Sequence, residues 1–126
     1  MPHAYDPTNI FARILRGEIP NKTVVETAHT LAFHDIAPQA PVHVLVIPKG
    51  AYATFDHFAA EASAEELVDF HRVCARICAD LGLSLAEGGP GYRAITNAGG
   101  HGGQEVPHYH LHLLGGRPLG RMVERA

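Results

Sequence analysis

Apolar residues recur at helical spacing in two parts of this chain of 126 residues. Near the start, Asp6 and Pro7 have the form of an N-cap residue followed by a proline at the first helical position, and an apolar stripe follows them. In the middle, Ser63 and Glu66 have the spacing of a capping box, ahead of an apolar stripe that ends at Gly82. The pattern predicts one short N-terminal helix and one long central helix.

Short apolar segments bounded by turn residues predict the strands. They cover residues 23–26, 31–35, 43–47, 92–96 and 106–114. The segment 43–47 is almost continuously apolar and rich in β-branched residues, so we expect a central strand that is buried on both faces. Strands in this order can pair antiparallel with their neighbours. The expected class is α+β, with an antiparallel sheet of about five strands.

Composition and charge exclude several classes of protein. Ten Lys and Arg against thirteen Asp and Glu give a net charge of −3, so we expect no nucleic-acid partner. The length is that of one domain, and residues 1–126 are expected to form it. No apolar run reaches the roughly 18 residues of a membrane helix, and the first residues lack the pattern of a signal peptide. These features indicate a cytoplasmic protein with no membrane partner.

Three of the ten histidines, His108, His110 and His112, lie in a single pentapeptide. Successive side chains of a strand point to opposite faces, so the three imidazoles should share one face while residues 109, 111 and 113 pack on the other. A zinc site is one interpretation, because two histidines at this spacing can share an ion. The outer two Cα atoms are roughly 13 Å apart, however, so all three rings cannot easily converge on one ion. From the row alone, a metal site and histidine-based catalysis both stay open.

A glycine-rich segment, residues 97–103, directly precedes the histidine row. Its four glycines free backbone N–H groups to form a nest for an anion. A sharp turn would also use glycines, and no Gly-Lys-Ser/Thr follows that would make the segment a P-loop. Beside three histidines, a phosphate ligand is the favoured interpretation.

Residues 108–114, His-Tyr-His-Leu-His-Leu-Leu, resemble the histidine triad motif His-φ-His-φ-His-φ-φ, in which φ is apolar and Tyr109 is the one loose fit. Further similar stretches follow in the same order along nearly the whole chain, at residues 10–20, 33–49, 102–104 and 115–117. The chain is thus similar to the histidine triad (HIT) superfamily. Within it, the chain resembles most the histidine triad nucleotide-binding proteins, which are purine nucleoside phosphoramidases. The resemblance implies a HIT fold.

The resemblance implies hydrolysis of the P–N bond of purine nucleoside 5′-phosphoramidates, with release of AMP or GMP and no cofactor. His110 stands at the position of the nucleophile, which would form a nucleotidyl-histidine. His112 and His43 would complete the polar network around it, and His108 would orient it. The second ring nitrogen of the nucleophile would be held by a hydrogen bond that fixes its tautomer. A neutral imidazole is available near pH 7, because its reference pKa is about 6.5.

The same resemblance assigns nucleotide-binding positions. Asp35 matches the position whose carboxylate takes the ribose hydroxyls. Glu105 stands where the best-known members carry a small hydroxyl residue, and we expect only its backbone N–H to face the ligand, because its carboxylate would repel phosphate. The apolar slot for the base is matched by Ile10, Phe11, Ile14, Ile19 and Phe33, with His34 and Ile36 beside Asp35. The phosphate-contacting positions are Asn97, Gly103, Gln104 and Glu105, followed by His110, Leu111 and His112.

The expectations for a bound metal and for a protein partner come from comparing two segments, the first helix and the C-terminal segment, with the family pattern. Some members bind a structural zinc through Cys-x-x-Cys in the first helix, but Asn9 and Ala12 stand at those positions, so we expect no bound metal. In the family the C-terminal segment approaches the partner's active site across a homodimer. Here residues 117–126 lack the Trp-containing ending of eukaryotic members and look more like bacterial relatives. The expected partners are a purine nucleotide or nucleoside phosphoramidate and a second copy of the chain.

Other functions stay open beside the phosphoramidase. The chain could be a nucleotide-binding signalling or scaffold module with incidental hydrolysis, or a dinucleoside polyphosphate hydrolase. A metalloenzyme that uses the histidine row would carry stoichiometric zinc. A nucleotidyltransferase is disfavoured, because that branch has glutamine in place of the last histidine of the triad, which is His112 here.

Overall fold

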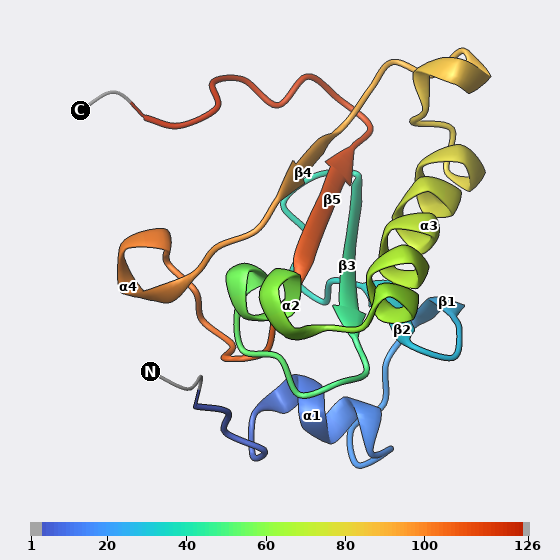
Figure 1. Ribbon diagram of the computed structural model, residues 1–126. Helices are drawn as coiled ribbons and strands as arrows, with labels where there is room; N and C mark the ends of the chain where they lie inside the picture. Colours follow the sequence, from blue (N-terminus) through green and yellow to red (C-terminus); the bar gives the residue numbers. More distant parts are fainter. Residues whose placement is uncertain (1–3, 125–126) are drawn as a thin grey trace.

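The computed structural model describes residues 4–124 and shows a five-stranded antiparallel sheet with helices on both faces (Figure 1). The strands are β1 (Thr23–Glu26), β2 (Thr30–His34), β3 (Val42–Pro48), β4 (Arg93–Ile95) and β5 (Leu111–Gly115). Their order across the sheet is β1-β2-β3-β5-β4. The helices are α1 (Ile10–Leu15), α2 (Phe55–Glu61), α3 (Ala64–Asp80) and α4 (Gly99–Gly102), with a 3-10 turn at Leu85–Glu87. The α+β class, the five strands and the short and long helices are confirmed; the ends of the expected single domain, residues 1–3 and 125–126, lie outside the described residues.

The predicted start of the first helix is wrong. Helix α1 begins at Ile10, and its N-cap is Asn9, whose side-chain oxygen accepts a hydrogen bond from the backbone N–H of Ala12 at 2.9 Å. Asp6 instead accepts from the backbone N–H and the hydroxyl of Thr8. Asp6 and Asn9 are both residues that favour the N-cap position, and the proline after Asp6 led to the prediction of the earlier start.

Three short elements escape the sequence prediction. Helix α2 is seven residues long and too short for a recognisable apolar stripe, although Thr54 caps it by accepting from the N–H of His57. Helix α4 is a single turn of glycine and histidine, residues of low helix propensity. Its C-cap is Gly103, whose φ of 77° lies in the left-handed region that favours glycine. The third element is the 3-10 turn.

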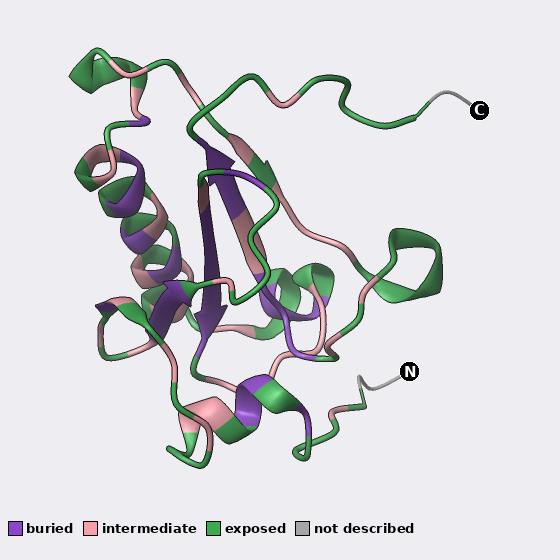
Figure 2. Ribbon diagram, turned by 180° about the vertical axis from the view of Figure 1, so that it is seen from behind, coloured by how far each residue is buried: buried purple, intermediate pink, exposed green. Residues whose placement is uncertain are grey.

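Strand β3 is buried on both faces, as its sequence predicts (Figure 2). Val44 and Val46 point to the face that α3 covers, while Leu45 and Ile47 point to the face of α1. The core on the α3 face contains Val25, Ala32, Val44, Val46, Phe58, Phe70, Val73, Ile77, Cys78, Tyr109 and Leu113. The smaller core on the α1 face contains Phe11, Leu31, Phe33, Leu45 and Ile47. The sheet therefore separates two packed layers, and Figure 1 shows α3 along one side of it.

Helix α3 has the capping box that the sequence predicts. The hydroxyl of Ser63 accepts from the backbone N–H of Glu66 at 3.1 Å, and the carboxylate of Glu66 accepts from the N–H of Ser63 at 3.0 Å. These bonds fix where the helix enters and hence which of its residues face the sheet. No helix in residues 4–124 is long and apolar enough to cross a membrane.

Candidate active site

The histidine row lies partly ahead of β5 rather than inside it. The strand pairs with β3 from Leu111 onward, whereas the backbone N–H of Tyr109 bonds to the carbonyl of Tyr52 at 2.7 Å. The predicted strand over residues 106–114 is therefore too long at its start. The alternation of side chains nevertheless holds, because residues 109, 111 and 113 pack in the core on the α3 face. The three imidazoles face α1, where the ring of Phe11 meets those of His108 and His110 edge to face.

His110 is held in one orientation and one tautomer. Its Nδ1 lies 2.7 Å from the backbone carbonyl oxygen of His108, and because a carbonyl only accepts, Nδ1 carries the hydrogen. The ring of Phe11 stands edge to face against it, with centroids 4.9 Å apart. The hydroxyl of Thr96 donates to the backbone carbonyl of His110 at 2.9 Å. In the described chain Nε2 of His110 has no hydrogen-bond partner, so its lone pair is available to an incoming atom.

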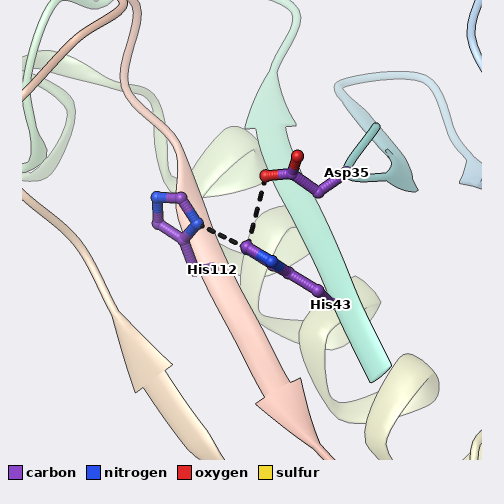
Figure 3. Close-up of side chains that lie close together, drawn as sticks. All are labelled: Asp35, His43 and His112. Atoms are coloured by element: carbon purple, nitrogen blue, oxygen red, sulfur yellow. Dashed lines mark hydrogen bonds and ion pairs between the residues drawn. The ribbon is translucent and has the colours of Figure 1, made fainter. Parts of the chain in front are cut away.

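His43 and His112 form a directly hydrogen-bonded pair (Figure 3). The backbone N–H of Gln39 donates to Nδ1 of His43 at 3.0 Å, so Nε2 of His43 carries the hydrogen of that neutral ring. This Nε2–H donates to Nδ1 of His112 at 2.8 Å, and a carboxylate oxygen of Asp35 lies 3.4 Å from the same nitrogen. Since Nδ1 of His112 accepts, the hydrogen of His112 sits on its Nε2.

The electrostatics favour neutral rings in the whole cluster. Burial lowers the pKa of His110, against the opposing effects of the His108 carbonyl and the carboxylates of Asp35 and Glu105. Burial lowers the pKa of His112 to about 4, assisted by the neighbouring rings of His110 and His43. Burial also lowers the pKa of His43, although Asp35 opposes it. At neutral pH these histidines are therefore uncharged, and the tautomers above apply.

The rings of His110 and His112 are neighbours, with centroids 5.1 Å apart and planes at 65°. One presents a nitrogen lone pair and the other presents an N–H donor. Such a pair can attack an electrophilic centre and donate to an oxygen bound to that centre at the same time. This is the chemical capacity of the site.

His108 does not face the open side of the cluster. Its ring is completely buried, and both ring nitrogens are bonded within the protein. Nε2 donates to the carbonyl of Pro48 at 2.8 Å, and Nδ1 lies 2.6 Å from the hydroxyl of Tyr5. Burial lowers its pKa to about 4, so the ring is neutral. His108 therefore contributes its fixed ring and its backbone carbonyl.

The described residues contain one group of three side chains close enough to share a metal ion, namely Asp35, His43 and His112. The 2.8 Å hydrogen bond between the two histidines occupies both donor nitrogens, whereas two nitrogens on a tetrahedral ion with bonds of about 2.0 Å lie about 3.3 Å apart. An ion on Nε2 of His43 would also move the hydrogen to Nδ1, where it would oppose the N–H of Gln39. The donor set therefore fits a chain of hydrogen bonds better than a metal ion. This chain, called the relay below, runs from the N–H of Gln39 through His43 to His112. Asn9 and Ala12, which stand where some proteins of the resembled family carry zinc-binding cysteines, form the cap of α1.

The predicted base slot is only partly assembled. Phe11 and Phe33 are buried in contact, with ring centroids 5.6 Å apart, and Ile14 packs against the same cluster. Ile19 is half-buried and lies outside this cluster. The remaining positions are at the surface: Ile10 is 43% exposed, Ile36 is 95% exposed, and His34 is exposed at the end of β2.

The phosphate-contacting positions lie on both sides of α4, with Asn97 ahead of it and residues 103–105 after it. The side-chain amide of Gln104 donates to the backbone carbonyls of Ala53 and Val106, and its oxygen accepts from the N–H of Gly99. Gln104 thus connects three stretches of backbone and holds the segment against the loop that precedes α2. Asn97 is half-buried, whereas Gly103 and Glu105 are exposed. Glu105 is close enough to act on the pKa of His110.

Several residues of the site were not found by sequence reasoning. Tyr5 and Pro48 hold the ring of His108, and the backbone N–H of Gln39 sets the tautomer of His43. Two of these contacts use backbone groups, which leave no trace in the residue type. Tyr5 lies 103 residues from its partner, and no spacing rule joins the two. Only long-range geometry brings these groups together.

Comparison with known proteins agrees with this fold. The HIT domain family matches residues 16–119 of the chain. A HIT-like protein of 13.2 kDa from Azospirillum brasilense is 53% identical over 125 residues, which is 99% of both chains. The purine nucleoside phosphoramidase of Escherichia coli K12 is 45% identical over 114 residues, or 90% of this chain and 92% of that one. A HIT family hydrolase from Clostridium thermocellum has a TM-score of 0.80 at 38% identity, covering 93% of this chain and 97% of its own. The fold, the cluster and these relatives together establish that the chain belongs to the HIT family.

Proposed function

We propose that this chain hydrolyses the P–N bond of purine nucleoside 5′-phosphoramidates and releases AMP or GMP. The observation that carries this proposal is the pair of fixed tautomers, the free Nε2 lone pair of His110 beside the Nε2–H of His112. The name of the Escherichia coli relative, at 45% identity, supports the same reaction. Residues 1–126 act as one HIT domain in this proposal.

In the first step, Nε2 of His110 attacks the α-phosphorus and forms a P–N bond to the ring. The bond to the amine breaks with its electron pair on the leaving nitrogen, which takes up a proton from solvent. The Nε2–H of His112 donates to a phosphoryl oxygen as negative charge develops there. The carbonyl of His108 continues to accept from Nδ1 of His110 and stabilises the positive charge that the ring gains on phosphorylation.

In the second step, a water molecule attacks the same phosphorus and loses a proton to solvent. The bond from phosphorus to Nε2 breaks, and its electron pair returns to His110. The ring is again neutral, with its hydrogen on Nδ1, because the carbonyl of His108 still holds that position. Two displacements at phosphorus with lower activation barriers replace a single displacement with a high one.

The nucleoside is held by the surrounding residues. Asp35 takes the ribose hydroxyls through its carboxylate, which one bond to the N–H of Ala37 already orients. Phe11 and Phe33 contact the base, and the segment that Gln104 braces contacts the phosphate through backbone N–H groups. The resemblance to the family also supports a homodimer, with the segment after Pro118 near the partner's histidine row.

The test is a steady-state assay with adenosine or guanosine 5′-phosphoramidates of a fluorescent amine. We expect turnover by the wild-type protein and, after rapid quench in alkaline denaturant, a nucleotidyl adduct on the peptide that contains His110, because the P–N bond to histidine is labile in acid but survives in alkali. Binding of AMP without any turnover would support the nucleotide-binding module instead. A chelator should leave the rate unchanged, and a loss of activity that zinc restores would support the metalloenzyme.

A further inference from the structure

The segment ahead of α1 reaches the histidine cluster through Tyr5. The phenol ring of Tyr5 stands edge to face against the ring of His108, with centroids 5.6 Å apart and planes at 70°. Its hydroxyl oxygen lies 2.6 Å from Nδ1 of His108, which is a short hydrogen bond. Tyr5 is half-buried and His108 is completely buried, so this bond is largely shielded from water.

The direction of this hydrogen bond follows from the other side of the ring. Nε2 of His108 faces the carbonyl oxygen of Pro48 at 2.8 Å, and a carbonyl can only accept. The hydrogen of the neutral ring is therefore on Nε2, and Nδ1 accepts. Tyr5 must then donate its hydroxyl hydrogen to Nδ1. The ring is held at both nitrogens, by the end of β3 on one side and by the N-terminal segment on the other.

His108 also carries the backbone carbonyl that accepts from Nδ1 of His110 at 2.7 Å. A residue whose ring is fixed at two points has little freedom to turn its own carbonyl. We infer that Tyr5 is a positioning residue of the active site, because its hydroxyl fixes His108 so that the carbonyl of His108 keeps the hydrogen of His110 on Nδ1. In its kinetic consequences this inference rests on the proposed function.

Loss of the hydroxyl has a defined consequence. Nδ1 of His108 would be a buried acceptor without a donor, which is unfavourable, and the ring could lower this cost by turning away from Pro48. The carbonyl of His108 would then hold His110 less firmly. The tautomer of an imidazole is set by the hydrogen bond of its other nitrogen, so His110 would spend more time with its hydrogen on Nε2. In that tautomer Nε2 has no lone pair with which to attack.

A role that is only structural makes a different prediction. If Tyr5 merely anchored the N-terminal segment, removing its hydroxyl would lower the free energy of unfolding and leave kcat and the tautomer of His110 unchanged. Tyr52 offers a matched control, because its hydroxyl bonds to both carboxylate oxygens of Glu66 at 2.8 and 2.9 Å, close to the start of α3. A Tyr52→Phe variant loses a half-buried tyrosine hydroxyl of the same kind outside the histidine cluster.

The experiment compares Tyr5→Phe and Tyr52→Phe in the full-length protein. Tyr5→Phe keeps the ring that packs on His108, and we expect a folded protein with kcat about tenfold lower and KM within about twofold, the size of one lost hydrogen bond. Tyr52→Phe should lower thermal stability and leave kcat unchanged. Long-range ¹H–¹⁵N spectra of the imidazole rings give the second readout. They should show Nδ1 of His108 losing its hydrogen-bonded shift in Tyr5→Phe and His110 shifting toward the Nε2–H tautomer.

Each outcome decides the inference. A tenfold loss of kcat together with the shift in tautomer supports it. A kcat within twofold of wild type overturns it, and so does a loss of kcat with ring spectra that match wild type. If the wild-type protein shows no phosphoramidase turnover, the proposed function fails, while the ring spectra still decide whether Tyr5 sets the tautomer of His110.

Discussion

The two faces of the sheet are stabilised by different interactions, although the same strands build both. On the α3 face, Tyr109 stacks against Phe58 and Phe70, with ring centroids 5.2 Å apart in each pair. Aliphatic side chains of β3 and α3 fill the space around these rings. This layer is held by apolar burial, which has little directional preference.

On the α1 face, the same stretch of chain presents His108, His110 and His112. Each ring has at least one hydrogen bond of 2.6 to 2.8 Å to a group outside the row or to the backbone of the row itself. Phe11 closes one side of the row with edge-to-face contacts. Here the geometry depends on donors and acceptors, and one reversed tautomer changes what the site can do.

The two faces of the sheet thus have different roles: the α3 face mainly stabilises the fold, and the α1 face carries the reactive groups. Packing on the α3 face has little directional preference, and this face carries more buried core residues than the α1 face. It holds the strands in register, and the opposite face can then carry polar groups whose positions are fixed. Substitutions should therefore affect stability on one face and turnover on the other.

The largest expected effect separates the two faces within one short stretch of chain, residues 110–113. His110→Ala removes the nucleophile and should lower kcat about 10⁴-fold, while the protein remains folded. Leu113→Ala on the α3 face should cost about 2 to 5 kcal/mol of stability and leave kcat of the folded protein within about threefold. Steady-state kinetics and urea unfolding measure both. Substantial activity in His110→Ala would place the nucleophile elsewhere.

The pH dependence of stability should come from the histidine face. Burial lowers the pKa of His108 and that of His112 to about 4, well below the 6.5 of an unfolded chain. Between pH 6.5 and 4 the unfolded state binds more protons than the folded state, so the free energy of unfolding falls as the pH falls. His108 alone should cost roughly 3 kcal/mol by pH 4.

Urea unfolding at pH 7, 6, 5 and 4 measures this loss, and NMR titration of the His108 ring protons assigns it. A free energy of unfolding that stays constant or rises between pH 7 and 4 would contradict the buried neutral rings. A ring of His108 that titrates near 6.5 would contradict them as well.

Much of the α3 face could be predicted from the sequence. The period of the apolar residues identified α3, and the continuous apolar run identified β3 as a strand buried on both faces, because burial leaves a regular pattern of residue types. The sharing of one face by the three histidines followed from the two-residue period of an extended chain. Helices α2 and α4 escaped prediction, because one is short and the other is built of glycine and histidine.

Less of the histidine face was predictable. The resemblance to the family placed the histidines in one site, but the tautomers depend on the carbonyls of His108 and Pro48 and on the N–H of Gln39. Every residue type offers a backbone carbonyl and every type but proline offers an N–H, so no pattern in the sequence marks these groups. Tyr5 depends on a contact across 103 residues. The exposed position of Ile36 also differs from a preformed base slot, because neither the loop after β2 nor the residues of α1 cover it.

An intermediate effect is expected from the relay behind His112. His43→Leu removes the donor to Nδ1 of His112 and the acceptor for the N–H of Gln39. The ring of His112 is then free to carry its hydrogen on either nitrogen, so it no longer presents a fixed Nε2–H to the phosphoryl oxygen. We expect kcat to fall about 10²-fold, which is typical for loss of one positioned donor. Single-turnover kinetics should place the loss in formation of the adduct, and a kcat within threefold of wild type would remove His43 from the relay.

The smallest expected effect is at the far end of that relay, where Arg117 lies at the surface. Its guanidinium donates to the backbone carbonyl of Gln39 at 3.0 Å, and the N–H of Gln39 in turn donates to His43. Gly116 makes this contact possible, because the chain turns there with φ at 93° and a Cβ would lie 2.7 Å from Pro41. Arg117 is exposed, so water can replace its hydrogen bond at small cost.

We therefore expect Arg117→Ala to lower kcat only about two- to fivefold, with KM unchanged, because the loop that holds Gln39 becomes less well ordered. Arg76→Ala is the matched control, since Arg76 is an exposed arginine of α3 that pairs with Asp80 on the opposite layer. Steady-state kinetics of both variants at low and high salt make the test. Equal kinetics for the two would show that the relay ends at the backbone of Gln39. A loss beyond about tenfold in Arg117→Ala would show that Arg117 does more than order this loop, since one exposed hydrogen bond is too weak to account for it.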